Sequence, residues 1–312
     1  MKIKVATFNL YQFVKPPYSW YTQKDKFNDF QWIEKTSWIK NQIIKMDCDI
    51  IGFQEVFCKD ALEKLVKELG FEYYETVDVA KLSNKTYIST TVAIASKYHI
   101  SKMHNFTSSF TFARIPIKAS ITLPNNEELL VYVAHLKSNR ENEYEYVFNK
   151  EHTLEHKKEV VSKALEGTSS SSLKQRLGEV SALFSDMKNH INKPIVLLCD
   201  FNDKEFSLCI DALSNYKYHD KKSKEDLLLY DASYYYKDVV YNPHPKAKKQ
   251  KRKATSYFLG KGSVLDYIFI SKHFKVNNYT VLDEHLHKYR NDLLLKSDHA
   301  QVVCELNLNQ GV

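Results

Sequence analysis

The sequence has 312 residues, 43% of them hydrophobic, and only seven Gly and seven Pro, a composition that excludes global disorder and favours a globular chain. The formal net charge of +7 is too small to identify a partner, but six basic residues lie between Lys246 and Lys253. The five cysteines are odd in number and no two have CxxC spacing, which argues against a disulfide framework and against a common zinc site.

The first residues, Lys2-Ile3-Lys4-Val5-Ala6, predict a strand and not a signal peptide. No apolar run approaches the roughly 18–20 residues that a membrane-spanning helix needs. We therefore expect a cytoplasmic protein, with no membrane association and no obligate protein partner.

The first half of the chain alternates between predicted strands and helices. Strands are expected over residues 3–8 and 49–54, and helices over 28–46 and 59–69, the second of which Gly70 ends. Further strands are expected over 90–96, 117–123 and 129–134, with a turn at Asn125-Asn126 between the last two.

The second half begins with two predicted helices, at about 143–165 and 173–191, joined by a Gly- and Ser-rich loop. Strands are expected over 194–199, 263–271 and 301–306, and the weak periodicity of 215–261 predicts a long basic loop region. Because no repeat or linker divides the chain, we expect one α/β domain over 1–312, with mixed sheets covered by helices.

Polar side chains repeatedly follow or open the apolar strands. They are Asn9, Glu55, His135, Asp200 with Asn202, and Asp298 with His299, and Asp266 lies within a further apolar strand. Ligands of α/β folds collect where strands end. Oxygen donors suit Mg²⁺, and cleavage of a phosphate ester needs neutralised charge and an activated water. The pattern therefore predicts a metal-dependent phosphoesterase site.

Each of these residues also has a structural explanation when it is taken alone. Asn9 suits a turn, Glu55 suits the start of a helix, and His135 suits a hydrogen-bonded structural histidine. Asp266 is harder to explain in this way, because a carboxylate within an apolar strand costs desolvation energy unless it has a partner. The joint occurrence of all the motifs in one order favours the functional interpretation.

In this order the motifs resemble the endonuclease/exonuclease/phosphatase superfamily, which has the DNase I-like fold. The matching segments are Thr7-Phe8-Asn9, Gln54-Glu55-Val56, Ala134-His135-Leu136-Lys137-Ser138, Cys199-Asp200-Phe201-Asn202, Leu265-Asp266-Tyr267-Ile268 and Ser297-Asp298-His299. The resemblance implies a four-layer α/β/β/α sandwich of two packed mixed sheets flanked by helices.

The resemblance also implies roles for the residues. One or two Mg²⁺ or Mn²⁺ ions would be held by Glu55, with Asn9 and Asp298 close to the metal. The implied catalytic residues are His135, Asp200, Asn202, Asp266 and His299. Among these, Asp200 and Asn202 would position and activate water, and Asp266 would orient His299. Which histidine acts as acid and which as base stays open.

Several departures narrow the family resemblance. Tyr11 stands where abasic-site endonucleases usually have a carboxylate, and His135 stands where they tend to have Tyr, so a repair role is disfavoured. Ser263-Val264-Leu265-Asp266-Tyr267 lacks the signature of inositol polyphosphate 5-phosphatases. Lys137 replaces the Gln that is typical of secreted sphingomyelinases, and Cys199 replaces the usual Gly.

The substrate depends on the basic run. Lys249, Lys251, Arg252 and Lys253 are predicted to bind substrate, as are Arg114 and Arg176, which match positions where bacterial members often carry arginine. A basic run flanked by tyrosines favours nucleic acid, and hence a nuclease acting on DNA or RNA. The alternatives are a phosphodiesterase or phosphatase acting on a small phosphorylated metabolite or lipid headgroup, and a non-catalytic binding module.

Overall fold

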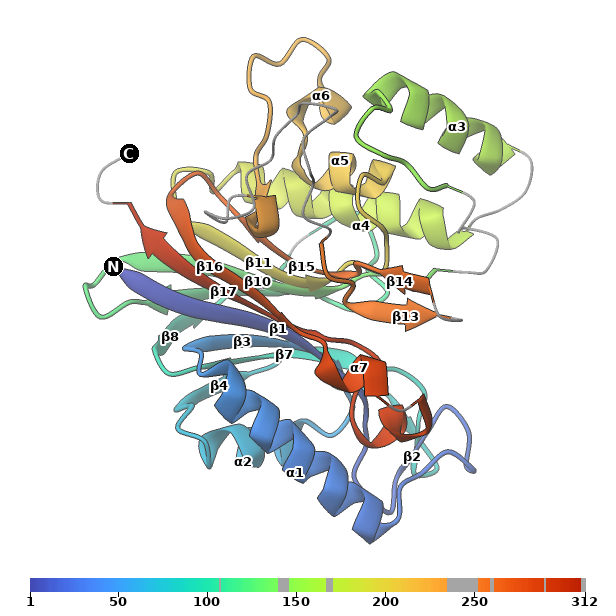
Figure 1. Cartoon of the computed structure of the whole chain (residues 1–312). Helices are drawn as coiled ribbons and strands as arrows, with labels where there is room; N and C mark the ends of the chain where they lie inside the picture. The colour runs from blue at the N-terminus through green and yellow to red at the C-terminus, as the bar shows by residue number, and fades with distance from the viewer. Residues whose placement is uncertain are drawn as a thin grey trace.

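Two six-stranded sheets pack face to face, with helices on both outer faces (Figure 1). The structure is a computed structural model that describes residues 1–106, 108–139, 146–166, 171–234, 252–258, 261–288 and 290–309. The predicted four-layer α/β/β/α sandwich of mixed sheets is confirmed.

The first sheet has the strand order β16-β17-β1-β3-β7-β4. Its strands are β1 (Lys2–Phe13), β3 (Ile50–Val56), β4 (Tyr73–Glu75), β7 (Thr91–Ser96), β16 (Phe274–Leu282) and β17 (Gln301–Leu308). The second sheet has the order β12-β15-β11-β10-β9-β8. Its strands are β8 (His99–Met103), β9 (Ile117–Thr122), β10 (Glu128–His135), β11 (Ile195–Asp200), β12 (Tyr230–Asp231) and β15 (Asp266–Ile270).

Each large sheet contains one parallel pair of strands, β1 with β3 in the first sheet and β10 with β11 in the second. The other pairs of these two sheets are antiparallel. Two small sheets form from β2 (Ser19–Trp20), β5 (Leu82–Ser83) and β6 (Thr86–Tyr87), and from β13 (Ser256–Phe258) and β14 (Lys261–Ser263).

Helices cover the outer faces because each presents apolar side chains to its sheet. Helices α1 (Asp29–Met46) and α2 (Lys59–Lys67) pack on the first sheet, through Ile39, Ile43, Leu62 and their neighbours. Helices α4 (Ser171–Lys188) and α5 (Leu208–Ser214) cover the second sheet, with α3 (Leu154–Glu166) beside them. The remaining helices are α6 (Tyr216–His219), α7 (Glu284–Lys288), η2 (Ala232–Tyr234) and η3 (Arg290–Leu295).

Most of the predicted elements are confirmed, some with shifted ends. Helix α1 starts where a capping box forms, because Asn28 accepts from the Gln31 amide while the Gln31 side chain accepts from the Asn28 amide. Within the described residues, the helix expected over 143–165 begins only at Leu154. The described part of 215–261 also differs from one long loop, because it contains α6, β12, η2 and the β13–β14 hairpin.

Strand β16 was not predicted from the sequence. It pairs along β17 at the edge of the first sheet, and its middle residues, Asn277, Asn278 and Tyr279, interrupt the apolar alternation. A register shift between Val276 and Asn278 accommodates this interruption. A bulged edge strand with one side toward solvent therefore gives little signal in the sequence.

Gly52 of β3 lies at the interface between the two large sheets, where the sheets leave no room for a side chain. A Cβ at this position would lie 2.8 Å from the Leu198 Cβ and 2.9 Å from a Val133 methyl group, both on the facing sheet. Neither neighbour can move aside easily, because both atoms lie close to the backbone of buried central strands. The absence of a side chain at Gly52 therefore sets the spacing of the sheets beside the strand ends.

We expect Gly52→Ala to lower the free energy of unfolding by about 1–3 kcal/mol, because the added methyl overpacks the interface between the sheets. The urea midpoint of unfolding measures this effect. Ser101→Thr is the control, since it adds one methyl group at an exposed position of the edge strand β8. Equal midpoints for Gly52→Ala and the wild type would contradict this account of the packing.

Candidate active site

The strand directions bring the predicted site residues to one edge of the sandwich. His135 and Asp200 end the parallel strands β10 and β11 and pair with each other in register. Asp266 begins β15, which is antiparallel to β11, and pairs with Asp200 from the other side. His299 precedes β17, which is antiparallel to β1, so it lies at the same edge as Asn9.

Strand alternation points these side chains into the space between the sheets. Ile3 and Val5 of β1, Val131 and Val133 of β10, and Val196 and Leu198 of β11 all belong to the apolar cluster between the sheets. Asn9, His135 and Asp200 continue these series with the same two-residue period. The apolar interface between the sheets therefore ends in a polar cluster.

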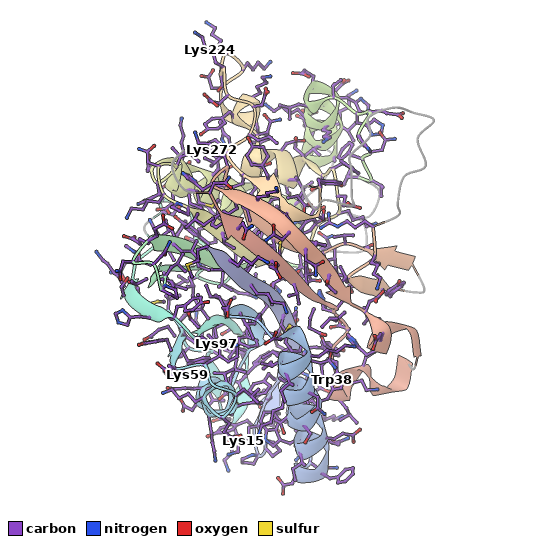
Figure 2. All side chains as sticks on the ribbon, turned by 60° about the vertical axis from the view of Figure 1, so that its left-hand side comes forward. Lys15, Trp38, Lys59, Lys97, Lys224 and Lys272 are labelled. Atoms are coloured by element: carbon purple, nitrogen blue, oxygen red, sulfur yellow. The ribbon has the colours of Figure 1, made fainter. Side chains whose placement is uncertain are left out.

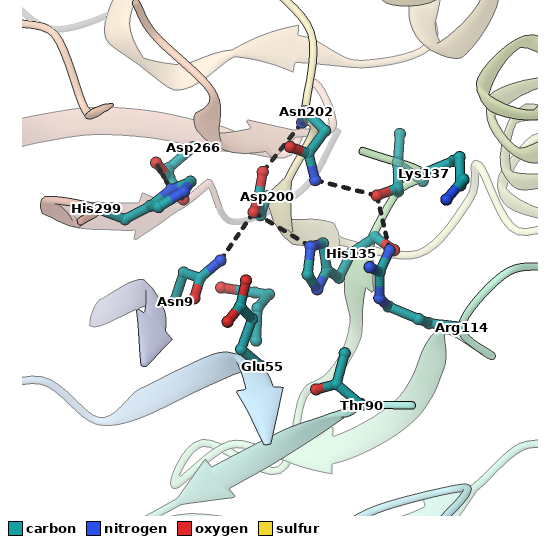
Figure 3. Close-up of polar contacts among 12 residues, drawn as sticks. Asn9, Glu55, Thr90, Arg114, His135, Lys137, Asp200, Asn202, Asp266 and His299 are labelled. Atoms are coloured by element: carbon teal, nitrogen blue, oxygen red, sulfur yellow. Dashed lines mark hydrogen bonds and ion pairs between the residues drawn. The ribbon is translucent and has the colours of Figure 1, made fainter. Parts of the chain in front are cut away.

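Glu55 reaches the site by a backbone irregularity. Ile51 and Phe53 of β3 face the helices, so regular alternation would direct Glu55 away from the other sheet. The register of β3 with β7 shifts between Phe53 and Val56, and Glu55 has a left-handed φ of 57°. Its Oε2 atom accepts a hydrogen bond of 3.0 Å from the Gln12 amide, and Figure 3 shows the carboxylate beside Asn9 and His135. A strained residue thus turns the carboxylate inward.

Asp200 lies at the centre of the cluster (Figure 3). Its Oδ2 atom accepts a hydrogen bond of 2.9 Å from Asn9 Nδ2 and lies 3.4 Å from His135 Nε2. Its Oδ1 atom accepts from the Asn202 amide at 3.0 Å, and Asn202 Nδ2 donates to the Leu136 carbonyl at 3.1 Å. Asn202 has a left-handed φ of 50°, a backbone conformation that Asn tolerates better than most residues do.

His299 and Asp266 form a buried pair on the other side of Asp200 (Figure 3). His299 Nδ1 lies 2.8 Å from Oδ2 and 3.0 Å from Oδ1 of Asp266, so the carboxylate fixes the orientation of the ring. The backbone is held as well, since Ser297 Oγ donates to the Asn9 carbonyl at 2.7 Å and accepts from the His299 amide.

The two histidines of the site have opposite charge preferences. Burial opposes a charge on His299, but the carboxylates of Asp266, Asp200 and Asp298 prevail and hold its pKa well above the ordinary value. Burial lowers the pKa of His135 well below the ordinary value, and the nearby charges of Arg114 and His299 add to this effect. At neutral pH the site therefore combines an imidazolium with a neutral imidazole.

Two of the site carboxyls have raised pKa values. Burial raises the pKa of Asp200 to about 7, against the opposing effect of His299. Burial also raises the pKa of Asp298 to about 6, again opposed by His299, and the nearby charge of Glu55 adds to the rise. Within the described part of the chain, Asp298 Oδ1 and His135 Nδ1 are buried without a hydrogen-bond partner. The site thus has free acceptors and closely spaced acidic groups.

Lys35 of α1 was not singled out from the sequence, although it supports the site from behind. It is fully buried, and its Nζ atom donates to the carbonyls of Leu294 and Lys296, each at 2.9 Å. Burial lowers the pKa of Lys35 to about 7, while Asp298 and Glu55 favour its charged form. The segment that leads to Asp298 is therefore tied to α1 by a buried lysine.

Arg114 lies at the rim of the site, where its guanidinium donates to the carbonyl of Leu136 at 3.0 Å (Figure 3). Arg176, predicted to bind substrate, is instead 1% exposed, with Nε 3.3 Å from Asp203 Oδ2 and Nη1 donating to the Lys137 carbonyl at 3.1 Å. Buried in this way, Arg176 supports the segment after His135, which corrects the expectation of substrate contact.

Glu179 lies one turn after Arg176 on α4 and was also missed. Its buried carboxylate accepts from the amides of Ala113 and Lys137, each at 2.9 Å. These amides belong to the residues beside Arg114 and Leu136, so one helix fixes both segments at the rim. A charged residue on a helix face is ordinarily interpreted as solvent-exposed, which is why Glu179 was not predicted to support the site.

The basic run is only partly described. Lys249 and Lys251 lie outside the described residues, so their predicted contact with substrate stays a prediction. Arg252 is turned inward, with Nη1 2.6 Å from Asp231 and 3.1 Å from Glu205, and its use in these ion pairs corrects its expected role at a phosphate backbone. Lys253 is largely exposed and pairs with Asp283 at 3.0 Å.

The described lysines are spread over the molecule. Figure 2 labels Lys15 and Lys59 near the helices of the first sheet, and Lys272 and Lys224 on the opposite side of the molecule. The distribution of these lysines gives no direct indication of where a polymer would bind.

Among the described residues, no helix has the length and apolar character needed to cross a bilayer.

The arrangement of carboxylates and histidines at one edge of a double sheet also matches a known family. Residues 6–299 match the profile of the Endonuclease/Exonuclease/phosphatase family. The chain belongs to this family. It is thus a phosphoesterase hydrolase, and the relationship predicted from the motifs is confirmed.

Several solved structures share the fold at low sequence identity. An endonuclease/exonuclease/phosphatase from Bacteroides vulgatus matches with a TM-score of 0.61 and 15% identity over 99% of this chain and 100% of that one. A mannosyl-6-phosphatase from Bacteroides thetaiotaomicron has a TM-score of 0.59 and 17% identity over 98% and 100%. The human Nocturnin catalytic domain has a TM-score of 0.58 and 17% identity over 99% and 95%. The comparison with curated proteins gave no significant match.

We expect Lys35→Met to lower kcat by roughly tenfold, because small displacements of reacting groups are costly and Lys35 fixes the segment that carries Asp298 and His299. The two uncovered carbonyls should also lower the free energy of unfolding by about 1–3 kcal/mol. Steady-state kinetics well below the melting transition separates the two effects. Lys40→Met, on the same helix with an exposed partner, Glu68, is the control. A folded Lys35→Met variant with wild-type kcat would contradict this support role.

Proposed function

We propose that the chain is a single-domain, divalent-metal-dependent phosphoesterase that hydrolyses phosphodiester bonds of DNA or RNA. The observation that carries the proposal is the cluster itself. Asp200, with a pKa near neutrality, lies between a neutral His135 and a charged His299–Asp266 pair. A group that accepts a proton beside groups that stabilise negative charge is what hydrolysis of a phosphate ester requires.

Glu55, Asp298 and Asn9 are the residues proposed to hold Mg²⁺ or Mn²⁺, as one or two ions. Their donors are oxygens, which hard cations prefer, and the buried Asp298 Oδ1 has no hydrogen-bond partner among the described residues. Burial and the nearby charge of Glu55 raise the pKa of Asp298, and a divalent cation would favour the charged form of this carboxyl. The bound ion would neutralise charge on the phosphate and lower the pKa of a coordinated water.

A second group could in principle bind a cation, since donor atoms of Asp200, Asp266 and His299 lie within 4.8 Å of one another. We assign the metal to the Glu55 side instead. His299 Nδ1 is already engaged by both oxygens of Asp266, and the raised pKa of His299 favours an imidazolium, which cannot ligate a metal.

The remaining roles follow from charge and geometry. Asp200, held by Asn9 and Asn202, is suited to accept a proton from the attacking water, because its pKa lies near the working pH. His299 is suited to donate a hydrogen bond or a proton to the phosphate through Nε2, since Asp266 occupies Nδ1. His135 contributes a neutral ring whose Nδ1 atom is buried without a partner in the described structure.

The proposed preference for nucleic acid rests more on aromatic side chains at the rim of the site than on the basic run. Arg252 of that run forms ion pairs with Glu205 and Asp231 inside the protein. Tyr21 is 51% exposed, and partial burial raises the pKa of its hydroxyl. The charge of Glu55 adds to this rise and that of Arg114 opposes it, so the side chain lies near both. An exposed ring beside a phosphate site can stack on a base. The alternative is a phosphatase of a small phosphorylated metabolite. We retain it because a mannosyl-6-phosphatase has a similar fold.

We expect the purified protein with Mg²⁺ or Mn²⁺ to cleave single-stranded DNA or RNA oligonucleotides faster than mannose 6-phosphate or inositol phosphates. EDTA should abolish this activity, and Glu55→Gln should lower it by roughly 10²-fold or more, because the metal supplies several kcal/mol of charge stabilisation. Glu63→Gln, on the exposed face of α2, is the control. Cleavage of monoesters alone would favour the metabolite phosphatase, and activity in EDTA would exclude the proposed metal role.

We expect His299→Ala and Asp266→Asn each to lower kcat by roughly 10²–10⁴-fold, the usual effect of losing or misorienting a positioned acid or base. The double variant should lose much less than the product of the two effects, because Asp266 acts through His299. His99→Ala, on the edge strand β8, is the matched control. Fully multiplicative losses in the double variant would show that the two residues act independently.

A further inference from the structure

We call the group of Asn9, Glu55, His135, Asp200, Asp266 and His299 the catalytic cluster. A groove of about 380 Å³ lies beside it, and we call this groove the aromatic groove. It is formed by the segment before β7 and by the connection between β8 and β9. The residues that define it here are Lys81, Thr90, Phe106, Phe110, Phe112 and Ile115. None of them is among the residues assigned above to metal binding or proton transfer.

Two lining residues of the aromatic groove lie next to residues of the catalytic cluster or its rim. Thr90 Oγ1 donates to the carbonyl of Val56, the residue after Glu55, at 3.2 Å. Ile115 follows Arg114, whose guanidinium bonds to the Leu136 carbonyl next to His135. Figure 3 shows Thr90 and Arg114 on the same side of the cluster as Glu55 and His135. The groove is therefore placed to receive part of a substrate whose phosphate lies at the catalytic cluster.

The lining combines flat apolar surface with polar groups. Phe106 and Phe112 meet edge to face at 5.1 Å, Phe110 lies 6.3 Å from Phe112, and Ile115 is 43% exposed. The hydroxyl of Thr90 and the side chain of Lys81 lie along the same groove. A nucleobase matches this surface, because it has both a π face for stacking and a polar edge for hydrogen bonds. The polar edge of a base also offers acceptors to the Lys81 ammonium, whereas an acyl chain would cover this group without offering one.

We propose that the aromatic groove is a nucleobase subsite that binds the base next to the scissile phosphate and thereby determines specificity. The inference rests on the proposed function, since it assumes a phosphodiester at the catalytic cluster. Phe112 and Ile115 are specificity-determining residues in this account. Stacking of one base on aromatic side chains corresponds to about five- to a hundredfold in affinity.

The test compares two phosphodiesters that differ only in the base. One is a thymidine dinucleotide, and the other carries an abasic tetrahydrofuran residue in place of one nucleoside. The wild type should cleave the base-bearing diester with a kcat/KM about five- to a hundredfold higher than the abasic one. Phe112→Leu, which keeps an apolar side chain but removes the aromatic face, and Ile115→Ser should reduce this preference and leave the abasic diester unaffected.

Phe30→Leu is the matched control, because Phe30 is 74% exposed on α1 and does not line the groove. Ile115 is exposed, so Ile115→Ser keeps the test valid even if Phe112→Leu fails to fold. Equal cleavage of both diesters by the wild type, or equal losses on both in the variants, would overturn the subsite. Faster cleavage of lysophosphatidylcholine that depends on the same residues would assign the groove to an acyl chain and also overturn it. Cleavage of no diester at all would instead refute the proposed function.

Discussion

The hydrogen bond from Asn9 to Asp200 joins the two sheets at the point where their apolar interface ends. It connects an inward-facing residue of β1 to the last residue of β11, so the two halves of the site cannot separate without losing it. The close approach of the sheets at Gly52 makes this contact geometrically feasible. Asp200 also accepts a hydrogen bond from the Asn202 amide and lies against His135. The carbonyl of Asn9 accepts a hydrogen bond from Ser297 Oγ.

The fold, and the meeting of the candidate site residues at one edge of it, could be predicted because they depend on local regularities. Apolar strands with a polar residue at one end need no knowledge of tertiary contacts to be recognised, and the order of the motifs indicated the family. Alternation along β1, β10 and β11 explains why Asn9, His135 and Asp200 point inward. Glu55 was found by its motif and not by alternation, since only its left-handed backbone turns it toward the site.

The residues that escaped prediction, or were given the wrong role, are charged groups whose burial depends on tertiary packing. Lys35 and Glu179 lie on helices, where a single charge is typical of a solvent-exposed face, yet both are fully buried. Arg252 stands among other basic residues, and only the partners that the fold supplies, Asp231 and Glu205, show that it is held inside. A sequence records charge but not the partner that neutralises it, so such residues are recognised only in three dimensions.

The left-handed backbone of Glu55 has a consequence for how this enzyme can change over time. An L-residue in this conformation costs about 1–2 kcal/mol, a cost that glycine would avoid. A glycine at position 55 would therefore favour the native backbone while removing the proposed metal ligand. Selection for a more robust chain and selection for catalysis act in opposite directions at this residue, so a lineage released from the need for activity should tend to lose Glu55 early.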